Sequence, residues 1–435
     1  MRVGSGLKLP KPGEKLAVLL PGMGAVATTA IAGVEAVKRN LAVPVGSLTQ
    51  LGRLHSGGTD HGPLLREVLP LASIEDLVFG GWDPIPDDAY RAAVRANVLR
   101  REHLDPLGQE LEAIRPMPAL FDQSWVRRLD GPNVKTGTLR EKAEGLLQDI
   151  RTFMERNRCG RGVMVWTAST EVYAEIGPSH QTLKSFEAAL DRSDPTIAPS
   201  MVYAWAAIKA GIPFLNGAPN LSQDIPALRE LAERSGVATG GKDFKTGQTL
   251  MKTTIAPMLH ARLLGLEGWF STNILGNRDG EVLDDAASFK TKEVSKRSVL
   301  DQILSAKDHP ELYGDVEHKV TIHYYPPRGD NKEGWDAIDI FGWLGYPMQI
   351  KVNFQCRDSI LAAPIVLDLA LLGDLAQRAG EKGPQEWLSF FFKSPVTAPG
   401  KSAIHDLFTQ QAALQAQLRR YADQAAAAKS HSAVG

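Results

Sequence analysis

Four lysines in the second half of the chain have the clearest potential for chemistry. Lys292 and Lys296 are four residues apart on one face of an expected helix, where like charges repel unless an anion lies between them. Lys332 and Lys393 are single cations, and Lys393 directly follows three phenylalanines. Ammonium groups in a water-poor site stabilise negative charge that develops on oxygen, without a metal. For the first pair, a solvated helical face is the alternative.

Two polar, glycine-bearing segments could bind a ligand, and the first follows an expected strand, at the edge where open α/β sheets bind ligands. In residues 241–249, a hydroxyl, a backbone N–H and an amide stand at a helix start, as an anion site requires: Thr246, Gly247 and Gln248. Residues 273–280 hold two amides and a carboxylate: Asn273, Asn277 and Asp279. A capped connection and a surface turn are the respective alternatives.

A glycine turn near the N-terminus has the spacing of a dinucleotide-binding motif. The apolar run 15–20 leads through Gly22-Met23-Gly24-Ala25-Val26-Ala27 into an expected helix at 25–37. In the pattern G-x-G-x-x-A, the first glycine permits the tight turn and the second lets a pyrophosphate approach the backbone. The helix start then offers free N–H groups to phosphate. A turn without any ligand is the alternative.

The acid that usually follows such a turn by about 20 residues, where it binds the adenine ribose, is missing. Residues 43–47 contain no Asp or Glu, so a standard dehydrogenase fingerprint fails. The nearest substitute is Asp83, at the end of another expected strand. A turn or helix-capping aspartate is the alternative.

The elements that would position these groups alternate between buried strands and helices as far as residue 245. Strands are expected at 15–20, 77–79, 162–166, 212–215 and 237–239. Helices are expected at 25–37, 87–99, 138–157, 183–190, 200–210 and 225–235. This alternation predicts a doubly wound α/β fold with a parallel sheet.

The pattern changes after Thr246. Val320-Ile322-Tyr324 and Met348-Ile350-Val352-Phe354 alternate with polar residues, which predicts half-buried antiparallel strands in a second domain. Their free face is a candidate surface for another subunit. Helices are expected at 248–262, 359–378 and 410–428.

Composition excludes several classes of protein. The 435 residues are 43% hydrophobic and 23% charged, which is typical of a globular chain with two or three domains. Lys and Arg number 49 and Asp and Glu 50, so no overall field favours nucleic acid or a membrane, and no stretch is expected to span one. Two cysteines, Cys159 and Cys356, are too few for a disulfide scaffold and fit a reducing cytoplasm.

Neither a metal site nor a secretion signal is expected. The ten histidines are scattered, and His55, Asp60 and His61 lie in a glycine-rich stretch typical of a mobile loop. Ala25-Val26-Ala27 imitates a signal-peptide cleavage site, but Pro21-Gly22-Met23-Gly24 interrupts the apolar run that a signal needs. We therefore expect a cytoplasmic protein without a metal.

Six blocks, in the family's order, resemble myo-inositol-1-phosphate synthases. They are VFGGWD (78–83), FLNGAP (214–219), DFKTGQT (243–249), NILGNRDG (273–280), KEVSK (292–296) and DSILAAP (358–364). The resemblance implies conversion of D-glucose 6-phosphate to 1D-myo-inositol 3-phosphate with bound NAD, usually in a homotetramer. It also implies a Rossmann-type NAD-binding domain at 1–245, an inserted α+β catalytic and tetramerisation domain at 246–358, and a return to the first domain at 359–435.

The resemblance assigns roles residue by residue. The active-site charges are Asp243, Lys292, Lys296, Lys332 and Lys393. The substrate phosphate and carbon chain are held by Thr246, Gly247, Gln248, Asn273, Leu275 and Asn277. NAD contacts Gly22, Gly24, Ala25, Val26, Asp83, Thr167, Ala168, Asn216, Gly217, Asp243, Asp279, Asp358 and Ser359. The glycine turn departs from the family's usual asparagine-containing loop.

The implied reaction removes hydride from C5, forms an enolate at C6, closes the ring onto C1 and returns the hydride. Lys292 is expected to accept the C5 hydroxyl proton, while Lys393 and Lys332 stabilise the C5 and C1 oxyanions. The substrate phosphate can serve as base at C6. The alternatives are a sugar-phosphate dehydrogenase that releases NADH, a non-catalytic NAD-binding protein, and an aldolase that forms a lysine Schiff base.

Overall fold

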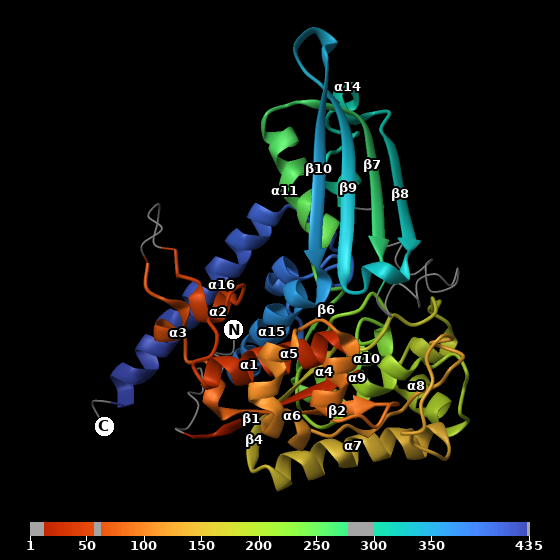
Figure 1. The fold of residues 1–435 in the computed structure, drawn as a ribbon, viewed down its shortest axis with the longest axis vertical. Coiled ribbons are helices and arrows are strands. Elements are labelled where there is room, and N and C mark those ends of the chain that lie inside the picture. The colour runs from red at the N-terminus through yellow and green to blue at the C-terminus, as the bar shows by residue number, and fades with distance from the viewer. Residues whose placement is uncertain (1–12, 56–61, 277–298, 433–435) are drawn as a thin grey trace.

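A computed structural model describes residues 13–55, 62–276 and 299–432, and its strands form two sheets (Figure 1). The larger sheet is entirely parallel, in the order β11-β6-β5-β4-β1-β2-β3. Its strands are β1 (Lys15–Pro21), β2 (Leu77–Asp83), β3 (Met117–Pro118), β4 (Cys159–Trp166), β5 (Phe214–Asn216), β6 (Ala238–Gly241) and β11 (Gly383–Pro384). The predicted doubly wound α/β fold is confirmed.

Helices cover both faces of this sheet, so side chains of each central strand are buried on alternating sides. Leu16 and Val18 of β1 pack in one apolar cluster, with helices α1 (Ala25–Lys38), α3 (Leu65–Val68), α4 (Ala89–Ala96), α5 (Arg101–Leu104), α6 (Gly108–Ala113), α15 (Asp358–Arg378) and α16 (Leu407–Ser432). Ala17 and Leu19 pack in a second cluster, with α7 (Leu139–Arg156), α8 (Leu183–Asp191), α9 (Pro199–Lys209) and α10 (Pro226–Ser235). Burial on both faces explains why β1 is a continuous apolar run.

Short helical turns complete the connections. They are α2 (Leu48–Leu51), α14 (Pro310–Tyr313) and the 3-10 turns η1 (Ile74–Asp76), η2 (Asp105–Leu107), η3 (Pro178–His180), η4 (Pro326–Arg328), η5 (Trp343–Gly345) and η6 (Glu386–Phe391). Helix α15 is long and apolar enough to cross a membrane, but 72% of its apolar stretch is buried in the structure, where it packs on α1 and β4. Core helices often meet the same length criterion.

The smaller sheet stands above the first in Figure 1, in the order β10-β9-β7-β8. Its strands are β7 (Gly265–Leu275), β8 (Glu317–Tyr324), β9 (Asn331–Phe341) and β10 (Pro347–Arg357). Helix α11 (Gly247–Ala261) packs on one face, where Leu259, Trp269 and Ile338 share a buried cluster.

One predicted strand direction is wrong. Strand β9 is antiparallel to β7 and β10, but β8, which contains Val320, runs parallel to β7. A long connection separates β7 from β8, and such a connection permits parallel pairing. The alternating pattern correctly indicated a partly exposed face but carries no information about strand direction.

The other strands and helices predicted within the described residues are present, with ends shifted by a few residues. The helix expected around Lys292 and Lys296 lies outside those residues. Strands β3 and β11 are not predicted from the sequence because each has only two residues. Strands β7 and β9 are not predicted either, since glycine and charged residues interrupt their apolar pattern. The domain boundaries at 245/246 and 358/359 stay a prediction.

Candidate functional site

A cavity of about 470 Å³ opens at the carboxyl ends of β1, β2 and β4. Strand β1 lies between β2, which begins one half of the sheet, and β4, which begins the other half. The strand order therefore reverses at the carboxyl end of β1. Doubly wound sheets bind ligands at this point. The cavity is therefore where the sheet topology predicts a cofactor.

The glycine turn after β1 forms one wall of the cavity. Gly22 has a φ of +82°, and a Cβ atom there would lie 2.3 Å from the Cα atom of Ala168, so only glycine fits. At Gly24, by contrast, a Cβ would meet no protein atom within 4 Å. Helix α1 starts directly after it, with Ala25 and Val26 facing the cavity. The room at Gly24 and the helix start suit the pyrophosphate of NAD.

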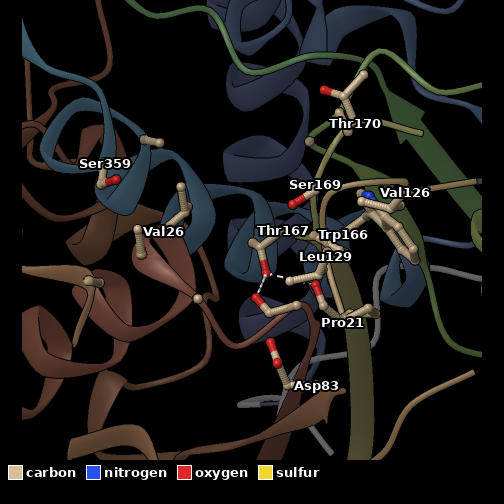
Figure 2. Close-up of a pocket in the computed structure, with 18 of the residues that line it drawn as sticks. Pro21, Val26, Asp83, Val126, Leu129, Trp166, Thr167, Ser169, Thr170 and Ser359 are labelled. Carbon is tan, nitrogen blue, oxygen red and sulfur yellow. Dashed lines mark hydrogen bonds between the residues drawn. The ribbon is translucent and has the colours of Figure 1, made fainter. Parts of the chain in front are cut away.

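The hydroxyl of Thr167 stabilises this turn by hydrogen bonds to its backbone. Its Oγ1 donates to the carbonyl oxygens of Pro21 at 2.9 Å and Gly22 at 3.0 Å, drawn as dashed lines in Figure 2. Figure 2 also shows Val26 and Ser359 across the pocket from the segment that contains Thr167.

The predicted ribose contact, Asp83, ends β2 and lines the cavity (Figure 2). Its Oδ1 accepts a hydrogen bond from the backbone N–H of Ile85 at 2.9 Å, which orients the carboxylate. An aspartate in this place accepts hydrogen bonds from ribose hydroxyls.

Asn216 is outside the cavity lining, and its side chain supports the loop that follows β5. Its Nδ2 donates to Asn220 O at 2.9 Å and Ser222 Oγ at 2.8 Å, and its Oδ1 accepts from Ala218 N at 2.9 Å. Gly217, in the same loop, does line the cavity, and a Cβ there would lie 2.2 Å from the ring of Phe244. Asn216 therefore shapes the wall that Gly217 presents.

At the other end of the cavity, Lys393 and Asp243 form a buried ion pair. The Lys393 Nζ lies 3.1 Å from Asp243 Oδ1, and the two residues are 8% and 4% exposed. Asp243 Oδ2 accepts no hydrogen bond from any residue that the structure describes. The pair thus places an ammonium group and a carboxylate oxygen in one dry part of the cavity.

A second pair lies nearby. Lys332, at the start of β9, places its Nζ 3.2 Å from Oδ2 of Asp358, the first residue of α15. The adjacent Ser359 donates its hydroxyl to Asp330 Oδ1 at 2.9 Å. Asp330, Asp358 and Ser359 all line the cavity.

The start of α11 offers an anion-binding surface beside this second pair. Thr246 precedes the helix and is buried, but its hydroxyl does not cap the first N–H groups in the part of the chain described here. A Cβ at Gly247 would lie 3.6 Å from the Lys332 Nζ, so the ammonium group stands directly over the helix start. Backbone N–H groups, the helix dipole and a cation together favour a phosphate.

The remaining predicted substrate contacts come from β7 and α11. Asn273 donates its Nδ2 to Gln248 Oε1, and Leu275 is buried at the end of β7. Four predicted residues are outside the described part of the chain, so their positions stay predictions: Asn277, Asp279, Lys292 and Lys296.

Several lining residues are not predicted from the sequence. Glu171, Tyr203 and Asp330 line the cavity, as do apolar residues between 119 and 129. Burial raises the pKa of Glu171 to about 7. Only Asp330 had a local signal, as a carboxylate two residues before Lys332. The others come from irregular or buried segments without a pattern that indicates a site.

Known proteins resemble this chain over nearly its whole length. A family model described as myo-inositol-1-phosphate synthase matches residues 16–419. An inositol-3-phosphate synthase of Bacteroides thetaiotaomicron is 55% identical over 408 residues, covering 93% of this chain and 95% of that protein. An Arabidopsis thaliana isozyme of the same name is 33% identical, covering 92% and 84%. The crystal structure of the Caenorhabditis elegans enzyme matches with a TM-score of 0.88 at 29% identity, covering 96% and 86%.

Proposed function

Because the chain belongs to the myo-inositol-1-phosphate synthase family, we propose that it binds NAD and converts D-glucose 6-phosphate to 1D-myo-inositol 3-phosphate. The reaction oxidises C5, removes a proton from C6, adds C6 to the C1 aldehyde and reduces C5 again. Substrate and product have the same composition, so the enzyme is an isomerase that uses NAD without consuming it.

One observation carries this proposal: a single cavity joins the glycine turn to the Lys393–Asp243 pair and to Thr246. Hydride transfer requires the nicotinamide ring to touch the reacting carbon. A continuous cavity with a dinucleotide-binding end and an anion-binding, lysine-bearing end meets that requirement.

The lysines divide the proton and charge chemistry. Bound NAD supplies the hydride acceptor for C5 and returns the hydride at the end. Lys292 takes the C5 hydroxyl proton and gives it back when C5 is reduced. The substrate phosphate takes the C6 proton, and the C6 carbanion forms the bond to C1 as the C1=O double bond opens. The phosphate then gives that proton to the C1 oxygen.

Lys393 and Lys332 stabilise the oxyanions at C5 and C1. Each is held by a carboxylate, Asp243 or Asp358, so its position is set before the substrate binds. Preorganised charges of this kind need no reorganisation during the reaction. Lys296 assists at the phosphate, together with Thr246, Gly247, Gln248, Asn273, Leu275 and Asn277.

The cofactor is held along the rest of the cavity. Gly24 and the start of α1 receive the pyrophosphate, and Asp83 binds the adenine ribose. Asp279, Asp358 and Ser359 are assigned to the nicotinamide and its phosphates, as the family resemblance implies. Thr167, Ala168, Asn216 and Gly217 support the walls.

The enzyme acts as a homotetramer in the cytoplasm. Support for self-association comes from exposed apolar residues at the β9–β10 turn, since Trp343 is 88%, Leu344 80% and Tyr346 70% exposed. Both cysteines are unpaired and buried, as suits a reducing compartment. Size-exclusion chromatography with light scattering tests the tetramer.

The first experiment incubates the purified protein with glucose 6-phosphate and NAD. Phosphorus NMR follows a new inositol phosphate, while absorbance follows NADH. Product without NADH accumulation is expected, because the hydride returns to the same molecule. NADH accumulation without a cyclised product would instead identify a sugar-phosphate dehydrogenase. Trapping by borohydride in the presence of substrate would identify a Schiff-base aldolase.

A further inference from the structure

The side-chain amide of Gln248 is enclosed by the four-stranded sheet. Its Nε2 donates to Thr272 O at 3.0 Å and lies 3.3 Å from Asp336 Oδ2 and 3.4 Å from Trp335 O, while its Oε1 accepts from Asn273 Nδ2. A carbonyl and a carboxylate can only accept hydrogen bonds, so they determine which end of the amide faces them. Both N–H groups of Gln248 therefore face the protein, and its oxygen faces Asn273.

Asp336 is itself held in one orientation. It is 2% exposed, and its Oδ1 accepts from Trp269 Nε1 at 2.8 Å and from Ser271 Oγ. The second oxygen, Oδ2, is left to face Gln248. Burial lowers the pKa of Lys252, one turn further along α11, to about 8, and the negative charge of Asp336 opposes that shift.

The pairing of β7 with β9 creates the space for this arrangement. Ser271 lies opposite Asp336, and Asn273 lies opposite Gly334. A Cβ at Gly334 would lie 2.9 Å from Cγ and 3.1 Å from Nε2 of Gln248. Gly334 thus makes room for the side-chain amide of Gln248, and Asp336 supplies one hydrogen-bond acceptor for that amide.

We propose that Asp336 is a positioning residue for substrate binding, which it performs by fixing the amide of Gln248 and, through it, the amide of Asn273. This inference rests on the proposed function, in which Asn273 contacts glucose 6-phosphate. Asn273 is 1% exposed, and because it donates one N–H to Gln248, its oxygen and its other N–H remain for the ligand contact that the proposed function assigns to it. Gln248 contributes to the phosphate site through its backbone N–H at the start of α11.

The substitution Asp336→Asn probes this chain of contacts at nearly constant volume. The new oxygen still accepts from Trp269 and Ser271, but an N–H now faces the N–H of Gln248. Two facing donors repel, so the Gln248 amide is pushed away from residue 336, while the carbonyl oxygens of Thr272 and Trp335 still oppose its reversal. Asn273, which donates to this amide, must then shift as well. Gly334→Ala displaces the same amide sterically.

Ser271→Ala is the matched control. It removes a donor to Asp336 Oδ1 from the same strand pair and leaves Oδ2 facing Gln248. A loss of packing or of a buried hydrogen bond therefore affects all three variants, whereas a displaced Gln248 amide affects only Asp336→Asn and Gly334→Ala.

The test measures calorimetric binding of glucose 6-phosphate to the NADH complex, which cannot accept hydride and so cannot turn the substrate over. We expect binding to weaken about tenfold or more in Asp336→Asn and Gly334→Ala, with a matching rise in KM. Ser271→Ala should bind within about twofold of wild type, although its melting temperature falls.

The inference is overturned if the Asp336→Asn variant folds and binds glucose 6-phosphate like wild type. It is also overturned if the Ser271→Ala variant binds the sugar phosphate as poorly as the Asp336→Asn variant does. If Asp336→Asn does not fold, Gly334→Ala decides by the same criterion. Cyclisation by the wild type is measured in parallel. Wild type that binds the sugar phosphate without cyclising it contradicts the proposed function but not the role of Asp336.

Discussion

Lys393 and Asp243 are 150 residues apart in the chain, yet their side chains and their backbones are bonded to each other. The ammonium group lies 3.1 Å from the carboxylate, and Lys393 N donates to Asp243 O at 2.7 Å. On either side, Lys242 N donates to Ser394 O at 3.0 Å and Lys245 N to Phe391 O at 2.8 Å. The position of this lysine is therefore set by backbone pairing, as a preorganised site requires.

Lys393→Met should reduce both activity and stability. The variant removes the charge that stabilises the C5 oxyanion, so kcat should fall about 10²–10³-fold. It also leaves Asp243 buried without its cation, which should lower the free energy of unfolding by about 3–5 kcal/mol. Steady-state kinetics and urea unfolding measure the two effects. Lys242→Met is the control, because it breaks a different ion pair, the one between Lys242 and Asp224. A kcat for Lys393→Met within threefold of wild type would contradict the role assigned to Lys393.

Gly22→Ala and Gly24→Ala should separate stability from cofactor binding. A Cβ at Gly22 collides with Ala168 and its φ is positive, so this variant should lose melting temperature as well as NAD affinity. A Cβ at Gly24 meets no protein atom within 4 Å, so the variant should fold normally but obstruct the pyrophosphate. Thermal melts and NAD titration check this. Normal NAD affinity in Gly24→Ala would show that the pyrophosphate lies elsewhere.

Lys332→Gln should weaken the phosphate site. The ammonium group stands over Gly247 at the start of α11, so its removal takes a cation away from the anion site there. Because Lys332 also stabilises the C1 oxyanion, kcat should fall as well. We expect a rise in the KM for glucose 6-phosphate of about tenfold or more, with a smaller effect on the KM for NAD. The dissociation constant of inorganic phosphate, followed by calorimetry, gives the same comparison without turnover. Equal loss of both affinities would argue for a general disturbance of the cavity.

Glu171 should make the protein less stable as pH rises toward 7. Its carboxylate accepts hydrogen bonds from the N–H and hydroxyl of Ser200, but burial raises its pKa from 4.5 to about 7. Between these values the folded state binds more protons than the unfolded state, so this contribution to the free energy of unfolding decreases with rising pH.

Glu171→Gln removes that titration. Relative to wild type, the variant should gain about 1–3 kcal/mol of stability between pH 4.5 and pH 8, because the unfavourable buried charge no longer forms. Urea unfolding of both proteins at pH 5 and pH 8 measures the gain. A difference between the two proteins that does not change with pH would show that the pKa of Glu171 is the same in the folded and unfolded states, so that burial does not raise it.

Local spacing made the glycine turn and most of the elements predictable. A tight turn between a strand and a helix needs glycine at particular positions, and buried parallel strands need continuous apolar runs, so both leave a pattern in neighbouring residues. The family and the α/β fold that these patterns predict are confirmed by the comparisons and by the sheet topology. The direction of β8 left no such pattern, because alternation of polar and apolar residues is the same in both directions.

The residue order by itself determined which charged groups the chain carries, in which segments, and that they match a known family. Only the tertiary structure decided which side chains lie in contact. Lys393 pairs with Asp243 and Lys332 with Asp358, and the amide of Gln248 faces Asp336. The tertiary structure also showed that Asn216 supports a loop instead of lining the cavity. The physical reason is that these contacts join segments that are distant in the chain. The geometry of the contacts depends on how the two sheets and their helices pack, and the spacing of neighbouring residues carries no information about that packing.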